Sequence, residues 1–180
     1  MDLRIVERAQ QGDQEAFAEI AHAIAARLYA VAYRILRDHD RADDAAQHAI
    51  VAIWRDLPGL RDPDRFEAWA YRILVNSCYA EARRAKRAHE IPGFGADPTA
   101  PDDVMTVADR DQLERGFSRL SADQRAVLVL QHYLDLGLPE IAELLGVPLG
   151  TVKSRSHAAR QAMRAALEAD ARQAKGAQPA

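Results

Sequence analysis

The sequence is poor in the residues that build covalent cross-links or membrane spans. Cys78 is the single cysteine among 180 residues, which excludes an internal disulfide and a cysteine-rich zinc site. No apolar run approaches the roughly 20 residues needed to cross a bilayer. The amino terminus has no basic flank followed by an apolar stretch, so we expect no signal peptide. These absences predict a cytoplasmic protein without membrane insertion, in which Cys78 is buried and inert.

Catalytic patterns are missing as well. The six histidines are scattered, and the sequence shows no phosphate-binding loop, no metal-ligand cluster and no nucleophile–base pair. We therefore expect no catalytic residue, no metal and no cofactor, and an enzyme is disfavoured. The net charge of −3 at pH 7 argues against a protein that coats nucleic acid indiscriminately. If DNA is bound, the basic surface that binds it must be local.

Residues 140–164 contain the strongest positive signal, the internal spacing of a helix-turn-helix. Ala142 stands where two helices must cross closely, and Gly146 stands where the turn requires positive φ. Val152 follows as a β-branched residue for the core side of the second helix. That helix carries several cations and no acid before Glu168, and phosphate backbones attract such helices. The pattern predicts DNA binding, with a plain surface hairpin as the alternative.

The first half of the chain has the apolar periodicity of amphipathic helices. Three stripes carry it: Phe17, Ile20, Ile24, Leu28, Val31 and Ile35; Ala46, Ile50, Ile53 and Leu57; and Phe66, Trp69, Ile73 and Ser77. We expect the third helix to begin after Pro63, at the end of a turn-rich loop over residues 57–65. A short leading helix over residues 3–10 completes a helical bundle, residues 1–90.

Composition changes over residues 91–108. Three prolines and two glycines gather there beside several aspartates, which predicts a flexible acidic linker. Ser121, with Gln124 three residues later, has the form of a capping box at the start of a helix. Helical spacing then continues through a second domain, residues 109–172, and we expect a frayed tail over residues 173–180. The sequence thus predicts an all-α chain of two helical domains.

Three stretches carry a resemblance to a known family. Residues 42–54 read ADDAAQHAIVAIW, residues 66–84 read FEAWAYRILVNSCYAEARR, and residues 118–155 contain the helix-turn-helix. In this order, joined by an acidic linker, they resemble regions 2 and 4 of bacterial RNA polymerase sigma factors of the extracytoplasmic-function (ECF) type. The resemblance implies that the first stretch docks on the polymerase clamp and the second opens promoter DNA. The third would bind the minus-35 element.

In region 2, the resemblance implies a group that binds the polymerase clamp. Its members are Asp43, Asp44, Gln47 and His48. His48 stands at a position that is commonly Glu in the family, so this contact is expected to differ from the usual one. The alternative interpretation of the group is a solvated helix face.

The resemblance also implies a set of residues that open the minus-10 element. The loop over residues 57–65 would capture a flipped base, with Arg61 and Asp62 as readers, or else act as a plain connector. Asn76 would face the non-template strand, since single-stranded bases are held by amide or aromatic groups beside cations. Phe66 and Trp69 are expected in the core instead. The residues expected to contact phosphates are Arg83, Arg84, Lys86 and Arg87, with a solvated helix end as the alternative.

In region 4, Val152, Ala159 and Met163 are expected in the core. The residues that this turns outward, toward base edges of the minus-35 element by the resemblance, are Lys153, Ser154 and His157. Those expected to hold phosphates are Thr151, Arg155 and Arg160. Two positions depart from the family pattern, because Ser156 replaces a usually apolar residue and Ala158 replaces a frequent Arg.

The partners implied are core RNA polymerase, promoter DNA and an anti-sigma factor, in a stress response. Two rival interpretations differ in what they require. A dimeric transcription regulator would bind duplex operator by itself. A sigma-like decoy that sequesters an anti-sigma factor would be expected to lose DNA-reading cations such as Lys153 and Arg155, and this chain keeps both.

Overall fold

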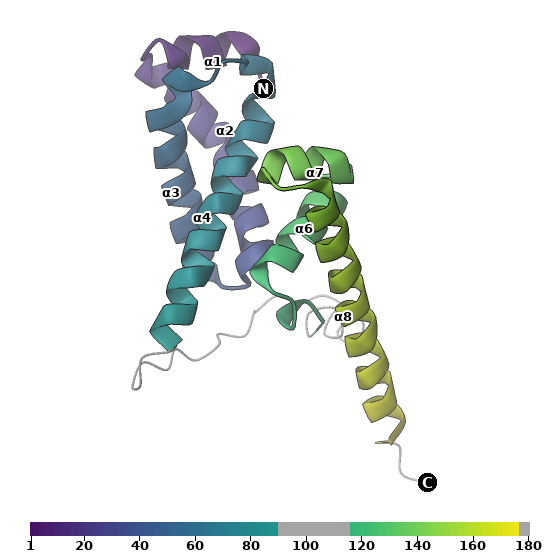
Figure 1. Cartoon of the computed structure of the whole chain (residues 1–180). Coiled ribbons are helices and arrows are strands. Elements are labelled where there is room, and N and C mark those ends of the chain that lie inside the picture. The colour runs from purple at the N-terminus through teal and green to yellow at the C-terminus, as the bar shows by residue number, and fades with distance from the viewer. Residues whose placement is uncertain (90–115, 177–180) are drawn as a thin grey trace. The chain divides into compact units, whose positions relative to one another are not determined.

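The computed structural model describes residues 1–89 and 116–176, and every regular element within these ranges is helical (Figure 1). The chain divides into two compact units, Met1–Pro98 and Thr99–Ala180, called here the amino-terminal and carboxy-terminal units. The predicted all-α fold is therefore confirmed. The predicted linker, residues 91–108, lies outside the described residues.

Three long helices and one short one build the amino-terminal unit. Its elements are α1 (Leu3–Gln10), α2 (Gln14–Leu36), α3 (His39–Asp56), the 3₁₀ turns η1 (Leu57–Gly59) and η2 (Pro63–Arg65), and α4 (Phe66–His89). Helices α2, α3 and α4 pack against one another along their lengths, and α1 lies across one end of them (Figure 1). There α1 contacts both η1 and η2. The predicted leading helix over residues 3–10 is confirmed.

The core of this unit follows the predicted stripes on α2 and α3, except that Phe17 and Ile50 are half-buried, but it does not follow the stripe on α4. Phe66 is buried as expected, whereas Trp69, Ile73 and Ser77 are only half-buried. The face of α4 that enters the core instead carries Ala70, Tyr71, Leu74, Val75 and Cys78. The first turns of α4 are apolar on more than one side, so helical period alone did not single out the inner face.

Cys78 is fully buried on this inner face of α4. Burial raises the pKa of its thiol to about 12, because the thiolate would lose its hydration in the core. The thiol therefore stays protonated near neutral pH, which is the state expected of an unreactive cysteine. The predicted burial of Cys78 is confirmed.

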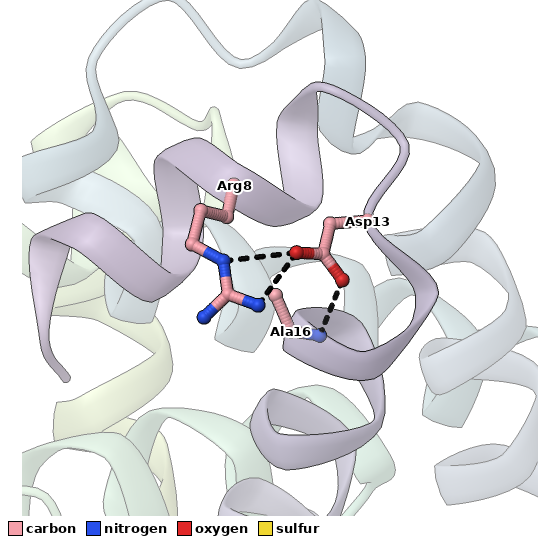
Figure 2. A network of polar contacts seen from close by, with 3 residues as sticks. All are labelled: Arg8, Asp13 and Ala16. Carbon is pink, nitrogen blue, oxygen red and sulfur yellow. Dashed lines mark hydrogen bonds and ion pairs between the residues drawn. The ribbon is translucent and has the colours of Figure 1, made fainter.

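A polar network fastens α1 to the start of α2 (Figure 2). Asp13 caps α2 by accepting the backbone N–H of Ala16 at 3.0 Å, and Arg8 of α1 donates to the same carboxylate at 2.6 and 2.9 Å. The Ala16 N–H and the Arg8 guanidinium both hold the pKa of the Asp13 carboxyl below its usual value. One side chain, Asp13, thus both caps α2 and pairs with α1.

The carboxy-terminal unit contains α6 (Ala122–His132), α7 (Leu138–Leu145) and α8 (Leu149–Gly176). All three pack against one another. The capping box at the start of α6 is confirmed, since Ser121 and Gln124 exchange their two hydrogen bonds at 3.3 and 2.9 Å. Helix α8 continues to Gly176, past the expected start of the frayed tail at residue 173. The last four residues lie outside the described ranges.

A small apolar core joins α6 to α8. Leu120, Leu128 and Ala159 are buried there, and the half-buried residues packed on them are Phe117, Ala162 and Met163. Val152 is also buried, as predicted, while Met163 is partly exposed at the edge of the core. Because these residues occupy one side of α8, the opposite side of the helix faces solvent.

Candidate nucleic-acid interface

Helices α7 and α8 form the predicted helix-turn-helix. Gly146 follows α7 with φ 65°. This left-handed conformation is unfavourable for residues that carry a Cβ atom, and glycine has none. The turn is closed by two backbone hydrogen bonds, from the N–H of Gly146 to Glu143 and from the N–H of Val147 to Ala142. Ala142 is buried next to this turn. The predicted positive φ at Gly146 is therefore confirmed.

The start of α7 is fixed independently of the turn. Gly137 lies at the amino-terminal cap, and its backbone N–H donates to a Glu140 carboxylate oxygen at 2.6 Å. This satisfies one of the donors that a helix leaves unpaired at its first turn. Both ends of α7 are thus defined by local bonds, which gives α8 a fixed starting point against it.

Helix α8 has a clean division between its inner and outer sides. Val152, Ser156 and Ala159 are 0% exposed on the inner side. The side chains that lie exposed on the outer side, as predicted, are Lys153, Ser154 and His157. The Ser154 hydroxyl donates to the Thr151 carbonyl at 2.9 Å, so its oxygen lone pairs remain available to a partner.

Ser156 has a structural explanation for its departure from an apolar residue. Its hydroxyl is buried and donates to the side-chain oxygen of Gln131 on α6 at 3.2 Å. A buried hydroxyl without such a partner would be costly. The serine therefore links α8 to α6 rather than weakening the core.

Two of the cations expected at phosphates already have partners within the carboxy-terminal unit. Arg155 is half-buried, with its guanidinium 3.4 Å from the Asp123 carboxylate on the first turn of α6. Arg160 is exposed, and its Nε donates to the Ser156 carbonyl at 3.4 Å. Arg155 thus has a role in holding α6 that the sequence did not suggest. Arg160 carries its charge at the surface.

On α4, the amide of Asn76 lies exposed. The cations that follow it at exposed positions are Arg83, Arg84, Lys86 and Arg87. Arg84 differs from the others because it donates to Glu81 at 2.7 Å. Its charge is partly neutralised within the molecule, so the basic run offers fewer available cations than its composition indicates.

Glu81 is a buried carboxylate that sequence reasoning missed. Glu81 is only 6% exposed. In addition to its bond with Arg84, its carboxylate lies 3.5 Å from Nδ1 of His48 on α3. The spacing of Glu81 and Arg84, three residues apart on one helix, is a signal that could have found the first contact. No local pattern points to the second, because His48 is far away in sequence. His48 therefore joins the exposed face of α3 to the inner side of α4.

The predicted polymerase-binding group lies together on one exposed face of α3. Its members Asp43, Asp44, Gln47 and His48 are all exposed, and Gln47 donates to Asp43 at 2.7 Å. The same face continues with two large apolar residues, Val51 at 63% exposed and Trp54 at 37%. Sequence reasoning assigned neither to this face, although their helical spacing from Gln47 would have placed them there.

The loop over residues 57–65 is built from η1 and η2 and holds Arg61 and Asp62 at its surface. Asp62 accepts the backbone N–H of Asp64 at 3.2 Å, which caps η2. Gln10 of α1 reaches the same loop and donates to the carbonyls of Leu57 and Leu60. That contact joins residues about fifty positions apart and has no signature in the sequence.

The described residues hold no group of three or more His, Cys, Asp or Glu that could bind a metal ion. None of the helices described is long and apolar enough to cross a membrane.

Comparison with known proteins agrees with this arrangement. The model of Sigma-70 region 2 matches residues 14–88, and that of Sigma-70 region 4 matches residues 110–163. The ECF RNA polymerase sigma factor SigW of Bacillus subtilis is 31% identical over 93% of this chain and 98% of its own. The RNA polymerase sigma-H factor of Pseudomonas aeruginosa is 31% identical over 93% of this chain and 94% of its own.

Two solved structures are similar as well. CnrH, in complex with the cytosolic domain of CnrY, has a TM-score of 0.64 and 27% identity, covering 94% of this chain and 98% of CnrH. The sigma factor RpoE of Bartonella quintana, in complex with the anti-sigma factor NepR, has a TM-score of 0.70 and 25% identity. It covers 86% of this chain and 98% of RpoE.

The fold and these matches define a two-domain sigma factor that contains regions 2 and 4. The chain belongs to the ECF RNA polymerase sigma factors. It directs promoter-specific transcription initiation, and it is an initiation factor rather than an enzyme.

Proposed function

We propose that this sigma factor divides promoter recognition between two helices, with α4 opening the minus-10 element and α8 reading the minus-35 element. The observation that carries the proposal is the pairing, in one chain, of two helices whose inner sides are buried and whose outer sides are polar. On α4 the outer side presents Asn76 before a basic run, and on α8 it presents Lys153, Ser154 and His157. A chain with a single duplex-reading helix would need only the second.

Core polymerase binds the exposed face of α3. Asp43, Asp44, Gln47 and His48 supply acid and hydrogen-bonding groups, and Val51 supplies an exposed apolar contact at their end. An exposed aliphatic side chain beside polar groups is the composition of a protein-binding patch with a polar rim. Since His48 also lies beside the buried Glu81, polymerase docking on α3 adjoins the helix that opens DNA.

The minus-10 element is opened by α4 and the loop before it. Arg61 and Asp62 contact a base flipped into the loop, and Asn76 contacts the non-template strand. Exposed cations Arg83 and Arg87 hold its phosphates, which fits the combination of amide and cation that single strands require. Arg84 contributes less to the phosphates than its neighbours, because it donates to Glu81.

The minus-35 element is bound in the major groove by α8. Lys153 and His157 contact base edges, and Ser154 accepts or donates there through its hydroxyl. The residues that fix the helix on the phosphate backbone are Thr151, Arg155 and Arg160. Arg155 contacts a phosphate while it remains beside Asp123. The Asp123 carboxylate orients the Arg155 guanidinium but weakens its attraction for the phosphate.

An anti-sigma factor controls the protein in the cytoplasm, where its polymerase acts, as part of a stress response. The support is that two proteins similar to this chain over most of its length were solved in complexes, RpoE with the anti-sigma factor NepR and CnrH with the cytosolic domain of CnrY. A partner that covers the α3 face would exclude polymerase by competition.

Run-off transcription with purified core polymerase tests the proposal. Genomic promoter fragments incubated with core enzyme and this protein should yield discrete transcripts, whose mapped starts define the minus-10 and minus-35 elements. Omission of the protein should abolish them. If no transcript depends on the protein while it binds duplex operators tightly by itself, it acts as an ordinary regulator and the division between α4 and α8 is wrong.

A further inference from the structure

Gln10, the last residue of α1, makes the most specific contact that the proposed function leaves unused. Its side-chain amide donates to the carbonyl of Leu60 at 2.7 Å and to that of Leu57 at 3.3 Å. Both partners are acceptors, so the amide nitrogen, which has two N–H groups, must face them. One side chain therefore satisfies two backbone groups of the loop that precedes α4.

The loop has little regular structure of its own to hold its shape. It contains two turns of 3₁₀ helix, η1 and η2, whose hydrogen-bond geometry is poorer than that of an α-helix. Leu57 is buried and anchors one end, while Arg61 and Asp62 are exposed. Between Leu57 and Arg61, the Leu60 carbonyl accepts a hydrogen bond from Gln10. Arg61 is the next residue along the chain.

Helix α1 is itself a fixed support. Val6 and Ala9 are buried, and Arg8 is joined to Asp13 at the cap of α2 (Figure 2). Helix α1 also contacts both η1 and η2. Gln10 thus extends from a helix that is fastened on two sides, so its amide is presented to the loop at little further cost in conformational entropy.

We propose that Gln10 is a positioning residue for promoter opening: it braces the loop over residues 57–65 so that Arg61 and Asp62 meet the flipped base in one geometry. The inference rests on the proposed role of this loop. Gln10 touches no DNA in this scheme. It acts by narrowing the conformations of the loop, which strengthens discrimination between bases rather than binding to polymerase.

Substitutions of Gln10 distinguish the effect of its hydrogen-bond donors from the effect of its side-chain packing. Gln10→Leu removes both donors at similar size, and Gln10→Glu places acceptors against the two carbonyls. Gln10→Lys keeps donors that can reach them. Gln11→Leu is the matched control, because the neighbouring Gln11 is exposed and its side chain faces no loop carbonyl in the described contacts. Tryptophan fluorescence reports folding of the same unit, since Trp54 and Trp69 both belong to it.

The assay measures the rate of open-complex formation by holoenzyme on single-base variants of the mapped promoter. Gln10→Leu and Gln10→Glu should lower discrimination at the captured minus-10 base by about tenfold, the factor that two ordinary hydrogen bonds would supply together. Discrimination across the minus-35 element and affinity for core polymerase should be unchanged. Gln10→Lys should retain most of the wild-type discrimination, and Gln11→Leu all of it.

The possible outcomes distinguish the proposed role of Gln10 from the proposed role of the loop in reading DNA. If Arg61→Ala or Asp62→Ala lowers minus-10 discrimination but Gln10→Leu does not, the loop reads DNA and the brace is wrong. If neither reader variant changes discrimination, the role of the loop fails, and the brace fails with it. A uniform loss at every promoter position in Gln10→Leu shows a merely structural residue. Should Gln10→Leu not fold, equal discrimination by Gln10→Lys and Gln10→Glu overturns the proposal.

Discussion

Helices α4 and α8 each bury one polar residue, and the two differ in charge. Glu81 on α4 is 6% exposed and Ser156 on α8 is 0% exposed; these are the buried polar residues of the described chain. Glu81 contacts a cation, Arg84, and a histidine on another helix, whereas Ser156 makes one neutral hydrogen bond to Gln131. Each polar residue ties its helix to a neighbour.

The difference in charge has a consequence for DNA binding. Burying a charged carboxylate is costly unless a positive group pairs with it, and Arg84, which donates to Glu81, is to that extent withdrawn from the basic run of α4. A buried hydroxyl needs no charge, so Ser156 leaves the cations of α8 at the surface. The cation of α8 that has an acidic partner, Arg155, lies beside Asp123, whose side chain is 48% exposed, so water screens this pair and Arg155 can contact a phosphate while it stays there. Cations counted along a helix therefore overstate its attraction for DNA where a buried acid lies within one turn.

Removal of Arg84 should have the largest effect on stability. Arg84→Ala leaves the Glu81 carboxylate buried with only the more distant His48, and should lower the free energy of unfolding of the amino-terminal unit by about 2 kcal/mol. Urea unfolding followed by tryptophan fluorescence measures this, because both tryptophans lie in that unit.

The control for Arg84 is Lys86→Ala, which removes an exposed cation from the same run. Its expected effect on stability is within about 0.5 kcal/mol, as for ordinary surface substitutions. Adding Glu81→Gln to Arg84→Ala should recover part of the loss, since the uncompensated charge is then gone. Equal stability of the Arg84→Ala and Lys86→Ala proteins would mean that Glu81 does not depend on its cation.

On α8, base-reading and phosphate-binding positions should separate in binding assays. Lys153→Ala or His157→Ala should change preference at one or two base pairs of the minus-35 element, by up to about 2 kcal/mol for a good base contact. Arg160→Ala should weaken binding to all sequences alike and reduce the salt dependence by about one phosphate. Holoenzyme binding across single-base variants, at several salt concentrations, measures both. Uniform loss in all three variants would contradict the assignment of base-reading residues.

On α4, Asn76 should act at the opened strand rather than on the duplex. Asn76→Ala removes an exposed amide, so folding and polymerase binding should be nearly unchanged. The rate of strand opening should fall by about tenfold, as for the loss of one or two hydrogen bonds. A promoter with a pre-melted minus-10 bubble should restore most of the activity. An equal defect on the pre-melted template would instead make Asn76 a structural residue.

The features that the sequence predicted well are those set by neighbours along the chain. The capping box of Ser121 and Gln124 and the left-handed turn at Gly146 depend on residues within one turn of a helix, so their spacing is enough. The outward positions Lys153 and His157 followed once Val152 fixed the inner side of α8.

The features that the sequence did not predict depend on contacts between distant residues. Glu81 with His48, and Gln10 with the loop carbonyls, are polar contacts without any period along the chain. The prediction of which side of α4 faces the core was wrong for a different reason. Trp69 and Ile73 are as apolar as their buried neighbours Ala70 and Leu74, and only packing against α2 and α3 decides between them.

The smallest expected effect concerns the neutral hydrogen bond of Ser156 on α8. Ser156→Ala removes the hydroxyl that donates to Gln131, and the half-buried amide of Gln131 can then turn to water. The cost should be about 1 kcal/mol, the net value of an ordinary hydrogen bond, on the carboxy-terminal unit. Helical circular dichroism during thermal unfolding measures it, with tryptophan fluorescence unchanged because that unit has no tryptophan. Ser154→Ala, an exposed serine two positions earlier, is the matched control and should cost less. A loss comparable to that of Arg84→Ala would show that the hydroxyl on α8 matters as much as the charge on α4, and the distinction between the two helices would not stand.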